Sequence, residues 1–318
     1  MGEMAAMAEE RAVVIVGAGP AGLAAAVYTG RALMKTTVLE RLVVGGQIVE
    51  AYEVDNYPGF ADGISGAELV DRMVAHATKF DVEIVNTPAK DVLLAGPMKR
   101  VLTDNGEYVA PILIIASGAY HRKLDVPGEK ELSGKGVSYC ATCDGPFFRG
   151  KKVAVVGGGD AALTESVFLT RFASEVDLIH RRSQFRGRAG HVKEAQENEK
   201  IKFILDTVVT RVHGKTRVEG VTMRNVKTNA ESRLDCDGVF VFVGHEPNTG
   251  YLTHILPEVA GSIIPVDFNM ETDVKGVYAV GDVRRGSYRQ VGTAVGEGIT
   301  AAMHAEVRIR DLLEARVK

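Results

Sequence analysis

The chain has 318 residues, 46% of them hydrophobic and 25% charged, which suits two globular domains with sizeable cores. Its formal net charge of -3 provides no overall basic surface, so we expect no nucleic-acid partner. Only three cysteines occur, too few for a disulfide-stapled secreted protein, so we expect a cytoplasmic protein.

The N-terminal residues are acidic and lack the apolar run of a signal peptide, and we expect the first ten to be disordered. Residues 13–30 carry no charge and reach the minimum length of a membrane span. Three glycines and a proline within the first ten residues of this segment instead predict a strand, a turn and a buried helix, with no membrane contact.

The first nucleotide signal is Gly17-Ala18-Gly19-Pro20-Ala21-Gly22, between a predicted buried strand at 12–16 and a predicted helix at 23–33. The first glycine permits a tight turn, the second admits a pyrophosphate, and the third lets the helix pack closely on the strand. A second strand, 36–39, ends at Glu40, which is placed to accept hydrogen bonds from ribose hydroxyls. We therefore expect a nucleotide with a free 2′-hydroxyl, such as FAD.

The next hundred residues predict loops, one helix and several strands. Gly45-Gly46-Gln47 and Asn56-Tyr57-Pro58-Gly59 predict loops, and Ser65 with Glu68 forms a capping box for a helix over 65–80. Strands are predicted at 82–85, 91–94, 100–103, 108–109 and 112–116. Small residues at 117–119 would let a ligand lie close, and we place the first domain crossing near residue 120.

Cys140-Ala141-Thr142-Cys143-Asp144 is the chemically distinctive stretch. Two cysteines at this spacing can be a redox pair, half of a zinc site, a short structural disulfide or a chance occurrence. No second pair of cysteines or histidines follows at zinc-finger spacing, so we expect no metal. Cys236 is far from the pair in sequence, and we interpret it as an ordinary core or edge thiol.

The nucleotide motif then repeats 140 residues later, where Gly157, Gly159 and Ala162 match Gly17, Gly19 and Gly22. Two copies predict two nucleotide-binding domains. Glu40 is matched by His180, which Arg181, Arg182 and Arg186 follow. Guanidinium groups at this place favour a 2′-phosphate, so we expect NADPH rather than NADH; the alternatives are a solvated face and a nucleic-acid patch.

The rest of the chain predicts strands at 202–205, 208–213, 218–224 and 238–242, then a return crossing within 244–249. A short strand over 276–280 leads into Gly281-Asp282, and a helix is predicted over 293–313. Asp282 either accepts hydrogen bonds from a flavin ribityl chain or caps a helix.

These motifs together resemble the low-molecular-weight thioredoxin reductases of the pyridine nucleotide–disulfide oxidoreductase class, over about residues 11–310. The resemblance implies an α/β fold of two Rossmann-like, three-layer ββα domains, with an NADPH domain (121–248) inserted into an FAD domain (1–120 and 249–318). It also implies a homodimer. Ser117, Ala161 and Val291 depart from the residues common in this family, without removing a required charge or sulfur.

The resemblance further implies how residues divide between the two cofactors. The implied FAD contacts are Gly17, Gly19, Pro20, Ala21, Gly22, Glu40, Gly46, Gln47, Asn56, Asp282, Arg289, Gln290 and Val291. The implied NADPH contacts are Gly157, Gly159, Asp160, Ala162, His180, Arg181, Arg182 and Arg186. Cys143 would be the sulfur next to the flavin, Cys140 the sulfur that attacks the partner, and Asp144 the acid/base.

The implied activity is NADPH-dependent disulfide reduction, in which electrons pass from NADPH to FAD, to the cysteine pair and to thioredoxin or a similar small redox protein. Rotation about hinges near residues 120 and 248 would alternate the cysteines and the nicotinamide at the flavin. No thioredoxin-like extension precedes residue 11, so a separate carrier is expected. The alternatives are a glutaredoxin-like or peroxidase-linked carrier, an NADPH:flavin oxidase, and a zinc-binding scaffold.

Overall fold

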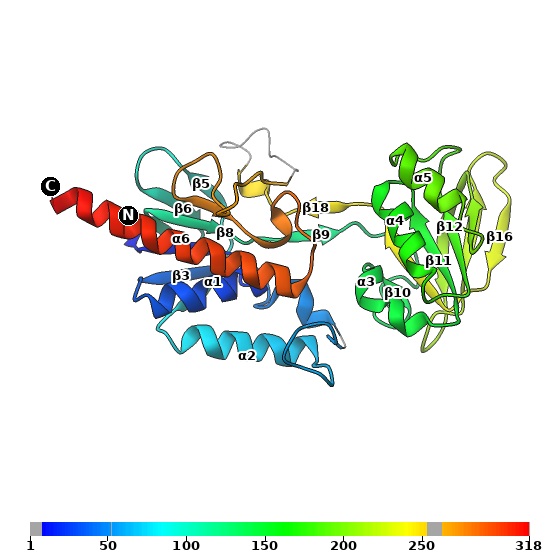
Figure 1. The fold of residues 1–318 in the computed structure, drawn as a ribbon, viewed down its shortest axis with the longest axis horizontal. Helices are drawn as coiled ribbons and strands as arrows, with labels where there is room; N and C mark the ends of the chain where they lie inside the picture. Colours follow the sequence, from blue (N-terminus) through cyan, green and yellow to red (C-terminus); the bar gives the residue numbers. More distant parts are fainter. Residues whose placement is uncertain (1–7, 52, 253–262, 318) are drawn as a thin grey trace, which may run out of the picture. The chain divides into compact units, whose positions relative to one another are not determined.

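The computed structural model describes residues 8–51, 53–252 and 263–317. The chain divides into two compact units, each described below by itself. Unit 1 combines the residues up to Tyr120 with those from Glu246 onward, and unit 2 comprises His121–His245. The chain crosses between them at β9 (Ala119–His121) and β18 (His245–Pro247) (Figure 1). Unit 2 is thus inserted into unit 1.

Unit 1 is built around a five-stranded parallel sheet in the order β19-β8-β2-β3-β4. Ile15 on β2 pairs with Val38 on β3 and with Ile114 on β8. All of β2 and β8 is buried, which explains their continuous apolar sequences. The strands are β2 (Val13–Val16), β3 (Thr36–Glu40), β4 (Glu83–Asn86), β8 (Ile112–Ile115) and β19 (Val277–Ala279).

Helices and a second sheet cover the two faces of this central sheet. Because side chains alternate along a strand, Ile15 and Ile114 pack with the helices, whereas Val14 packs with Val101 and Tyr108 of the second sheet. The helices are α1 (Pro20–Arg31), α2 (Gly66–Thr78) and α6 (Val291–Val317). The second sheet contains β1 (Glu9–Glu10), β5 (Asp91–Leu93), β6 (Lys99–Thr103) and β7 (Gly106–Ala110).

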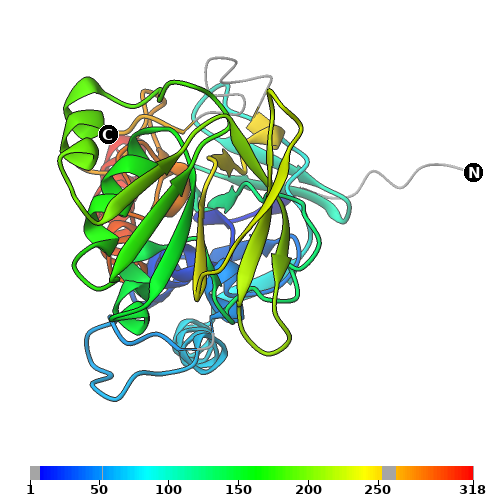
Figure 2. The ribbon, with the colours of Figure 1, turned by 90° about the vertical axis from the view of Figure 1, so that its right-hand side faces the viewer.

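Unit 2 repeats this layering around a parallel sheet in the order β10-β17-β11-β12-β13 (Figures 1 and 2). Its strands are β10 (Val137–Ser138), β11 (Lys152–Gly157), β12 (Glu175–Ile179), β13 (Ile201–Ile204) and β17 (Gly238–Phe242). One face packs with α4 (Asp160–Leu169) and α5 (Ala189–Gln196). The other packs with β14 (Thr207–His213), β15 (Gly220–Asn225) and β16 (Glu231–Leu234).

Short helices follow several strand ends and loops. The α3 helix (Ala141–Asp144) carries the second cysteine and continues into the 3₁₀ helix η2 (Gly145–Phe148). The other 3₁₀ helices are η1 (Gly46–Glu50), η3 (Gly250–Leu252) and η4 (Gly281–Val283).

The fold class predicted from the sequence is confirmed: two α/β units of the Rossmann type, one inserted into the other. Several local predictions were wrong. The first helix begins at Pro20 rather than at residue 23, because proline is pre-organised for the first helical position. Glu9 and Glu10 pair with β7 instead of being disordered, while residues 1–7 lie outside the described residues. The predicted loop at 45–47 runs into η1, and α5 and β16 were not predicted.

Candidate functional site

In the first glycine motif of unit 1, two glycines pack tightly against backbone atoms and the glycine between them does not. Gly17 has a φ of 106°, and a Cβ there would lie 2.4 Å from the carbonyl oxygen of Ala116. A Cβ at Gly22 would lie 1.9 Å from the carbonyl oxygen of Gly17. A Cβ at Gly19, the N-cap of α1, would meet no atom within 4 Å. A ligand can therefore approach the backbone at Gly19, where the N-terminus of α1 favours negative charge.

Glu40, at the end of β3, lies beside this motif. Its Oε2 accepts a hydrogen bond from the amide of Ala18 at 2.8 Å, and its Oε1 accepts one from the amide of Leu42 at 2.9 Å. These bonds orient the carboxylate at the start of α1. Each oxygen keeps further acceptor capacity, which a ribose hydroxyl could use.

Two segments far away in sequence pack against the first turn of α1. A Cβ at Gly46, where η1 begins, would lie 3.5 Å from Gly19 Cα. A Cβ at Gly281, where η4 begins, would lie 3.1 Å from the Cβ of Ala21. The structure therefore brings η1 and η4 to the same place as the glycine motif.

Asp282 follows Gly281 in η4. Burial raises the pKa of its carboxyl group, and the charge of Arg289 and a 3.5 Å hydrogen bond from Ser287 Oγ oppose that rise only in part. The α6 helix begins only at Val291, so Asp282 is not its cap. The helix-cap alternative is therefore wrong.

The remaining predicted FAD contacts also lie in unit 1. Asn56 donates through Nδ2 to Oε1 of Gln290 at 3.2 Å, which joins two segments 234 residues apart. Gln47 donates through Nε2 to the carbonyl oxygen of Ala119. Arg289 has a φ of 55°, and its amide donates to Ser287 Oγ immediately before α6 begins at Val291.

A polar network after β8 was not identified from the sequence beyond its small residues. Ser117 Oγ donates to the carbonyl oxygen of Asn248 at 2.8 Å, and Asn248 Nδ2 donates to the carbonyl oxygen of Ser117 at 2.8 Å. Tyr251 donates its hydroxyl proton to Ser117 Oγ at 3.2 Å. These bonds join the end of the first segment of unit 1 to the start of its second segment.

In unit 2 the second glycine motif begins α4 in the same way. A Cβ at Gly157 would lie 2.5 Å from the carbonyl oxygen of Phe242 and 2.6 Å from the Cβ of Ala162, whereas a Cβ at Gly159 would meet nothing within 4 Å. The approachable glycine is again the N-cap residue.

His180 does not extend from the end of its strand as a free ligand. It is buried and stacked on Phe185 with ring centroids 5.1 Å apart, and a Cβ at Gly158 would lie 2.0 Å from its Cε1. Burial, with the neighbouring arginine charges, lowers the pKa of the imidazole, which favours its neutral form. Sequence analysis did not identify Gly158 as a site residue.

Residues 180–188 form what we call the arginine loop. Its Arg186 amide donates to the carbonyl oxygen of Gly158 at 2.8 Å, and its Arg188 amide donates to Asp160 Oδ1 at 2.7 Å. Asp160 Oδ1 also lies 2.8 Å from His191 Nδ1, so this predicted NADPH contact is held by protein groups. The loop is thereby fixed against the glycine motif.

Arg181, Arg182 and Arg186 are exposed on the arginine loop. Within residues 8–51, 53–252 and 263–317, none of the three forms an ion pair, whereas Arg188 lies 3.7 Å from Asp160. Three guanidinium groups thus remain available for an anion.

Cys140 and Cys143 form a disulfide, with their Cα atoms 5.3 Å apart. Cys140 is the N-cap residue of α3, and its sulfur accepts a hydrogen bond from the amide of Cys143 at 3.1 Å. Ser138 Oγ accepts a hydrogen bond from the amide of Cys140, and the amide of Asp144 donates to the carbonyl oxygen of Cys140. Asp144 therefore lies at the end of the same short helix.

The disulfide and the second glycine motif lie at the same edge of the sheet. Ser138 of β10 pairs with Phe240, Val155 of β11 pairs with the same residue, and all three strands are parallel. Gly157 is the last residue of β11, and Cys140 follows the end of β10 by two residues, so both lie at the carboxyl ends of the parallel strands that flank β17.

Cys236 lies apart from this edge. It is a free thiol buried in the core, and burial raises its pKa to about 12. A thiol that stays protonated is a poor nucleophile, which agrees with the interpretation of Cys236 as a core residue.

In the described part of the chain, no group of three or more His, Cys, Asp or Glu side chains is arranged to hold a metal ion. None of the helices that the structure describes combines the length and the apolar character of a membrane span.

Comparison with known proteins gives consistent matches. The family model for pyridine nucleotide-disulphide oxidoreductases matches residues 11–298. The thioredoxin reductase of Bacillus subtilis (strain 168) is 43% identical over 311 residues, which covers 97% of this chain and 98% of that protein. The bifunctional thioredoxin reductase/thioredoxin of Mycobacterium leprae (strain TN) is 44% identical over 296 residues, which covers 92% of this chain and 65% of that protein.

A solved structure agrees with these matches. The crystal structure of thioredoxin reductase from Streptococcus pyogenes MGAS5005 superposes with a TM-score of 0.90 at 39% identity, covering 96% of this chain and all of that chain. The resemblance inferred from the motifs is thereby confirmed. The chain belongs to the pyridine nucleotide-disulphide oxidoreductase family.

Proposed function

We propose that this protein is an NADPH-dependent flavoprotein that reduces the disulfide of thioredoxin. The observation that carries the proposal is the Cys140–Cys143 disulfide, which follows β10 at the sheet edge where the glycine motif follows β11, in a chain that contains a second such motif. This chain is at least 42% identical in sequence to several proteins named thioredoxin reductase, and this identity supports thioredoxin as the acceptor.

We assign FAD to unit 1. Gly19 leaves room for a pyrophosphate at the N-terminus of α1, and Glu40 is oriented toward a ribose by its bonds to two amides. Gly46 and Gly281 pack against the same turn, which places Asp282 next to it. The residues present therefore fit the group, and bound flavin would supply the two-electron chemistry that links a nicotinamide to a disulfide.

We assign NADPH to unit 2. Gly159 leaves the start of α4 open to a pyrophosphate. The arginine loop lies against that motif and presents Arg181, Arg182 and Arg186, whose charge suits a 2′-phosphate. His180 supports this site from beneath Gly158 as a buried, neutral ring.

The cysteines perform the exchange with the acceptor. After two electrons and a proton have opened the Cys140–Cys143 bond, the Cys140 thiolate attacks one sulfur of the acceptor disulfide and forms a mixed disulfide. Cys143 then attacks Cys140 and restores the starting bond, and the acceptor leaves as a dithiol after taking up a second proton from water. Asp144 would transfer protons to the leaving sulfur and from the attacking one.

The proposal is tested with Cys143→Ser in the flavin-loaded protein. We expect NADPH-driven reduction of thioredoxin to be abolished, while NADPH still bleaches the flavin absorbance. Cys236→Ala is the matched control, since its thiol is buried away from the disulfide, and it should keep thioredoxin reduction. Full turnover with thioredoxin in Cys143→Ser would refute the relay and leave an NADPH:flavin oxidase as the better description.

Cofactor and acceptor choice are tested on the unmodified protein. Rates with NADPH and NADH should differ strongly, and equal rates would contradict the role assigned to Arg181, Arg182 and Arg186. Thioredoxin should be reduced faster than a glutaredoxin-like or peroxidase-linked carrier. We also propose a homodimer, a cytoplasmic location and rotation about hinges near residues 120 and 248, which sedimentation, fractionation and domain-locking cross-links would test.

A further inference from the structure

The arginine loop is hydrogen-bonded to a segment that carries a carboxylate, although phosphate binding by the arginines does not need a negative charge there. Asp206 lies between β13 and β14, and its amide donates to the carbonyl oxygen of Arg182 at 3.3 Å. The amide of the next residue, Thr207, donates to the carbonyl oxygen of His180 at 2.9 Å. The backbone of Asp206 is therefore joined to the loop that carries the phosphate-binding arginines.

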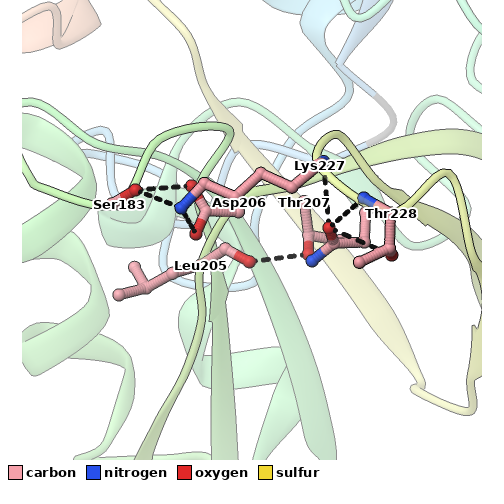
Figure 3. A network of polar contacts seen from close by, with 7 residues as sticks. Ser183, Leu205, Asp206, Thr207, Lys227 and Thr228 are labelled. Atoms are coloured by element: carbon pink, nitrogen blue, oxygen red, sulfur yellow. Dashed lines mark hydrogen bonds and ion pairs between the residues drawn. The ribbon is translucent and has the colours of Figure 1, made fainter.

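Asp206, Ser183 and Lys227 close a ring of polar contacts beside that loop (Figure 3). Ser183 Oγ donates to Asp206 Oδ1, Lys227 Nζ donates to Asp206 Oδ2, and Lys227 Nζ also donates to Ser183 Oγ, each at 2.8 Å. The ammonium and the hydroxyl lower the pKa of Asp206, so the carboxyl group is ionised at neutral pH.

The position of Lys227 is fixed by its own turn. Asn225 Oδ1 accepts hydrogen bonds from the amides of Lys227 and Thr228 at 3.0 and 3.1 Å. The ammonium group therefore reaches Asp206 from an ordered turn at the end of β15 and not from a free surface chain. The Asp206 side chain is only 18% exposed, whereas that of Lys227 is 61% exposed.

This pairing has an electrostatic consequence. A carboxylate near the end of the second strand is the feature that disfavours a 2′-phosphate in nucleotide sites of this type. Asp206 would have that effect if it were unpaired. Asp160, another carboxylate that contacts the loop, is likewise paired, with Arg188 and His191.

We propose that Lys227 is a specificity-determining residue, which secures the preference of unit 2 for a 2′-phosphorylated nucleotide by neutralising Asp206 and holding Ser183. The inference rests on the proposed NADPH function. Lys227 acts through Asp206 and the loop, so its removal should be compensated when the Asp206 charge is removed as well.

The experiment measures equilibrium binding of 2′,5′-ADP and 5′-AMP to the full-length protein, which requires no turnover. Lys227→Ala should weaken 2′,5′-ADP binding about two- to fivefold, the range expected for a partly exposed charge pair, and leave 5′-AMP binding unchanged. The loss should shrink at high ionic strength, because salt screens exposed charges. Adding Asp206→Asn to Lys227→Ala should restore binding of 2′,5′-ADP.

Lys215→Ala is the matched control. It removes the same charge from the same unit, but Lys215 lies beyond His213, at the opposite end of the β14–β15 hairpin from Asn225. It should leave both affinities unchanged. Thermal unfolding of each variant shows whether the fold is retained, and Lys227→Arg should keep the preference.

Two results with the variants would overturn the inference on its own. One is wild-type affinity for 2′,5′-ADP in Lys227→Ala, and the other is failure of Asp206→Asn to restore it. Thioredoxin reduction by the wild-type protein is measured alongside, so failure of the proposed activity is detected separately from the binding ratio. Equal wild-type binding of 2′,5′-ADP and 5′-AMP would overturn both the NADPH assignment and this inference.

Discussion

At the scale of residues, two matched pairs distinguish the nucleotide motifs of the two units. In unit 1 the carboxylate of Glu40 accepts a hydrogen bond from the amide of Ala18. At the corresponding place in unit 2, 140 residues later, the larger ring of His180 lies against Gly158. The change from alanine to glycine makes room for the change from carboxylate to imidazole, so each pair has to be considered together.

Gly158→Ala should therefore destabilise unit 2. Its new Cβ would lie 2.0 Å from Cε1 and 2.1 Å from Nδ1 of a ring that stacks on Phe185 and bonds to the Gln184 carbonyl oxygen, so the ring cannot move freely. We expect a loss of roughly 1–3 kcal/mol in the free energy of unfolding, measured with urea. Gly190→Ala in α5, where a Cβ meets nothing within 4 Å, should be neutral or stabilising. Equal stability of the two variants would contradict this account.

The same pairs show what could be predicted from the sequence. Spacing alone predicted the glycines, Glu40 and the arginines as candidate contacts and located the cysteine pair, because short motifs determine those local geometries. It did not identify Gly158, although the repeat itself contained the signal in the match of Ala18 to Gly158. It also missed the ring of Ser183, Asp206 and Lys227, because hydrogen bonds between a loop and a remote hairpin have no fixed spacing.

At the scale of elements, α6 does more than cover the sheet. Its Glu297 is buried, accepts a hydrogen bond from the Gly281 amide at 2.7 Å and pairs with Arg284. Gly298 lets α6 approach α1, since a Cβ there would lie 2.1 Å from the carbonyl oxygen of Ala21. The small residues of the sequence predicted the helix. They did not predict the contacts by which Glu297 fixes the η4 turn that contains Asp282.

Glu297→Ala should loosen that turn. It leaves the mostly buried Arg284 without its carboxylate and the Gly281 amide without its acceptor. Removing one partner of a buried ion pair typically costs about 3–5 kcal/mol, so we expect a loss near the lower end of that range in unfolding free energy, and faster release of FAD. Glu306→Ala, at an exposed position of α6, should change stability by less than about 0.5 kcal/mol. Unaltered stability and FAD release in Glu297→Ala would remove the role given to this pair.

At the scale of the whole molecule, the central sheets of the two units have the same spatial order of strands. They differ in where the edge strand comes in the chain, which is after the other four strands in unit 1 and before them in unit 2. The edge strand beside β8 in unit 1 is β19, which comes late in the chain, whereas the one beside β17 in unit 2 is β10, which comes first in its unit. Val280 and Asp282 follow the end of β19, and Cys140 follows the end of β10, each at the edge where the glycine motif of its unit begins. Asp282 and the disulfide therefore follow equivalent strands, which a linear repeat search cannot detect because their chain order is permuted.

This equivalence, together with cores that each stay within one unit, predicts separate responses to the two cofactors. Hydrogen exchange of the flavin-free protein should slow mainly at α1, η4 and the start of α6 when FAD is added, because a ligand that binds only the folded state stabilises the unit that holds it. Addition of 2′,5′-ADP should slow exchange at β11, α4 and the arginine loop instead. Peptides of α2 and β16 are internal controls, since neither element contributes a proposed contact. If FAD protected residues 152–188 more than residues 13–31, the assignment of the cofactors to the units would have to be reversed.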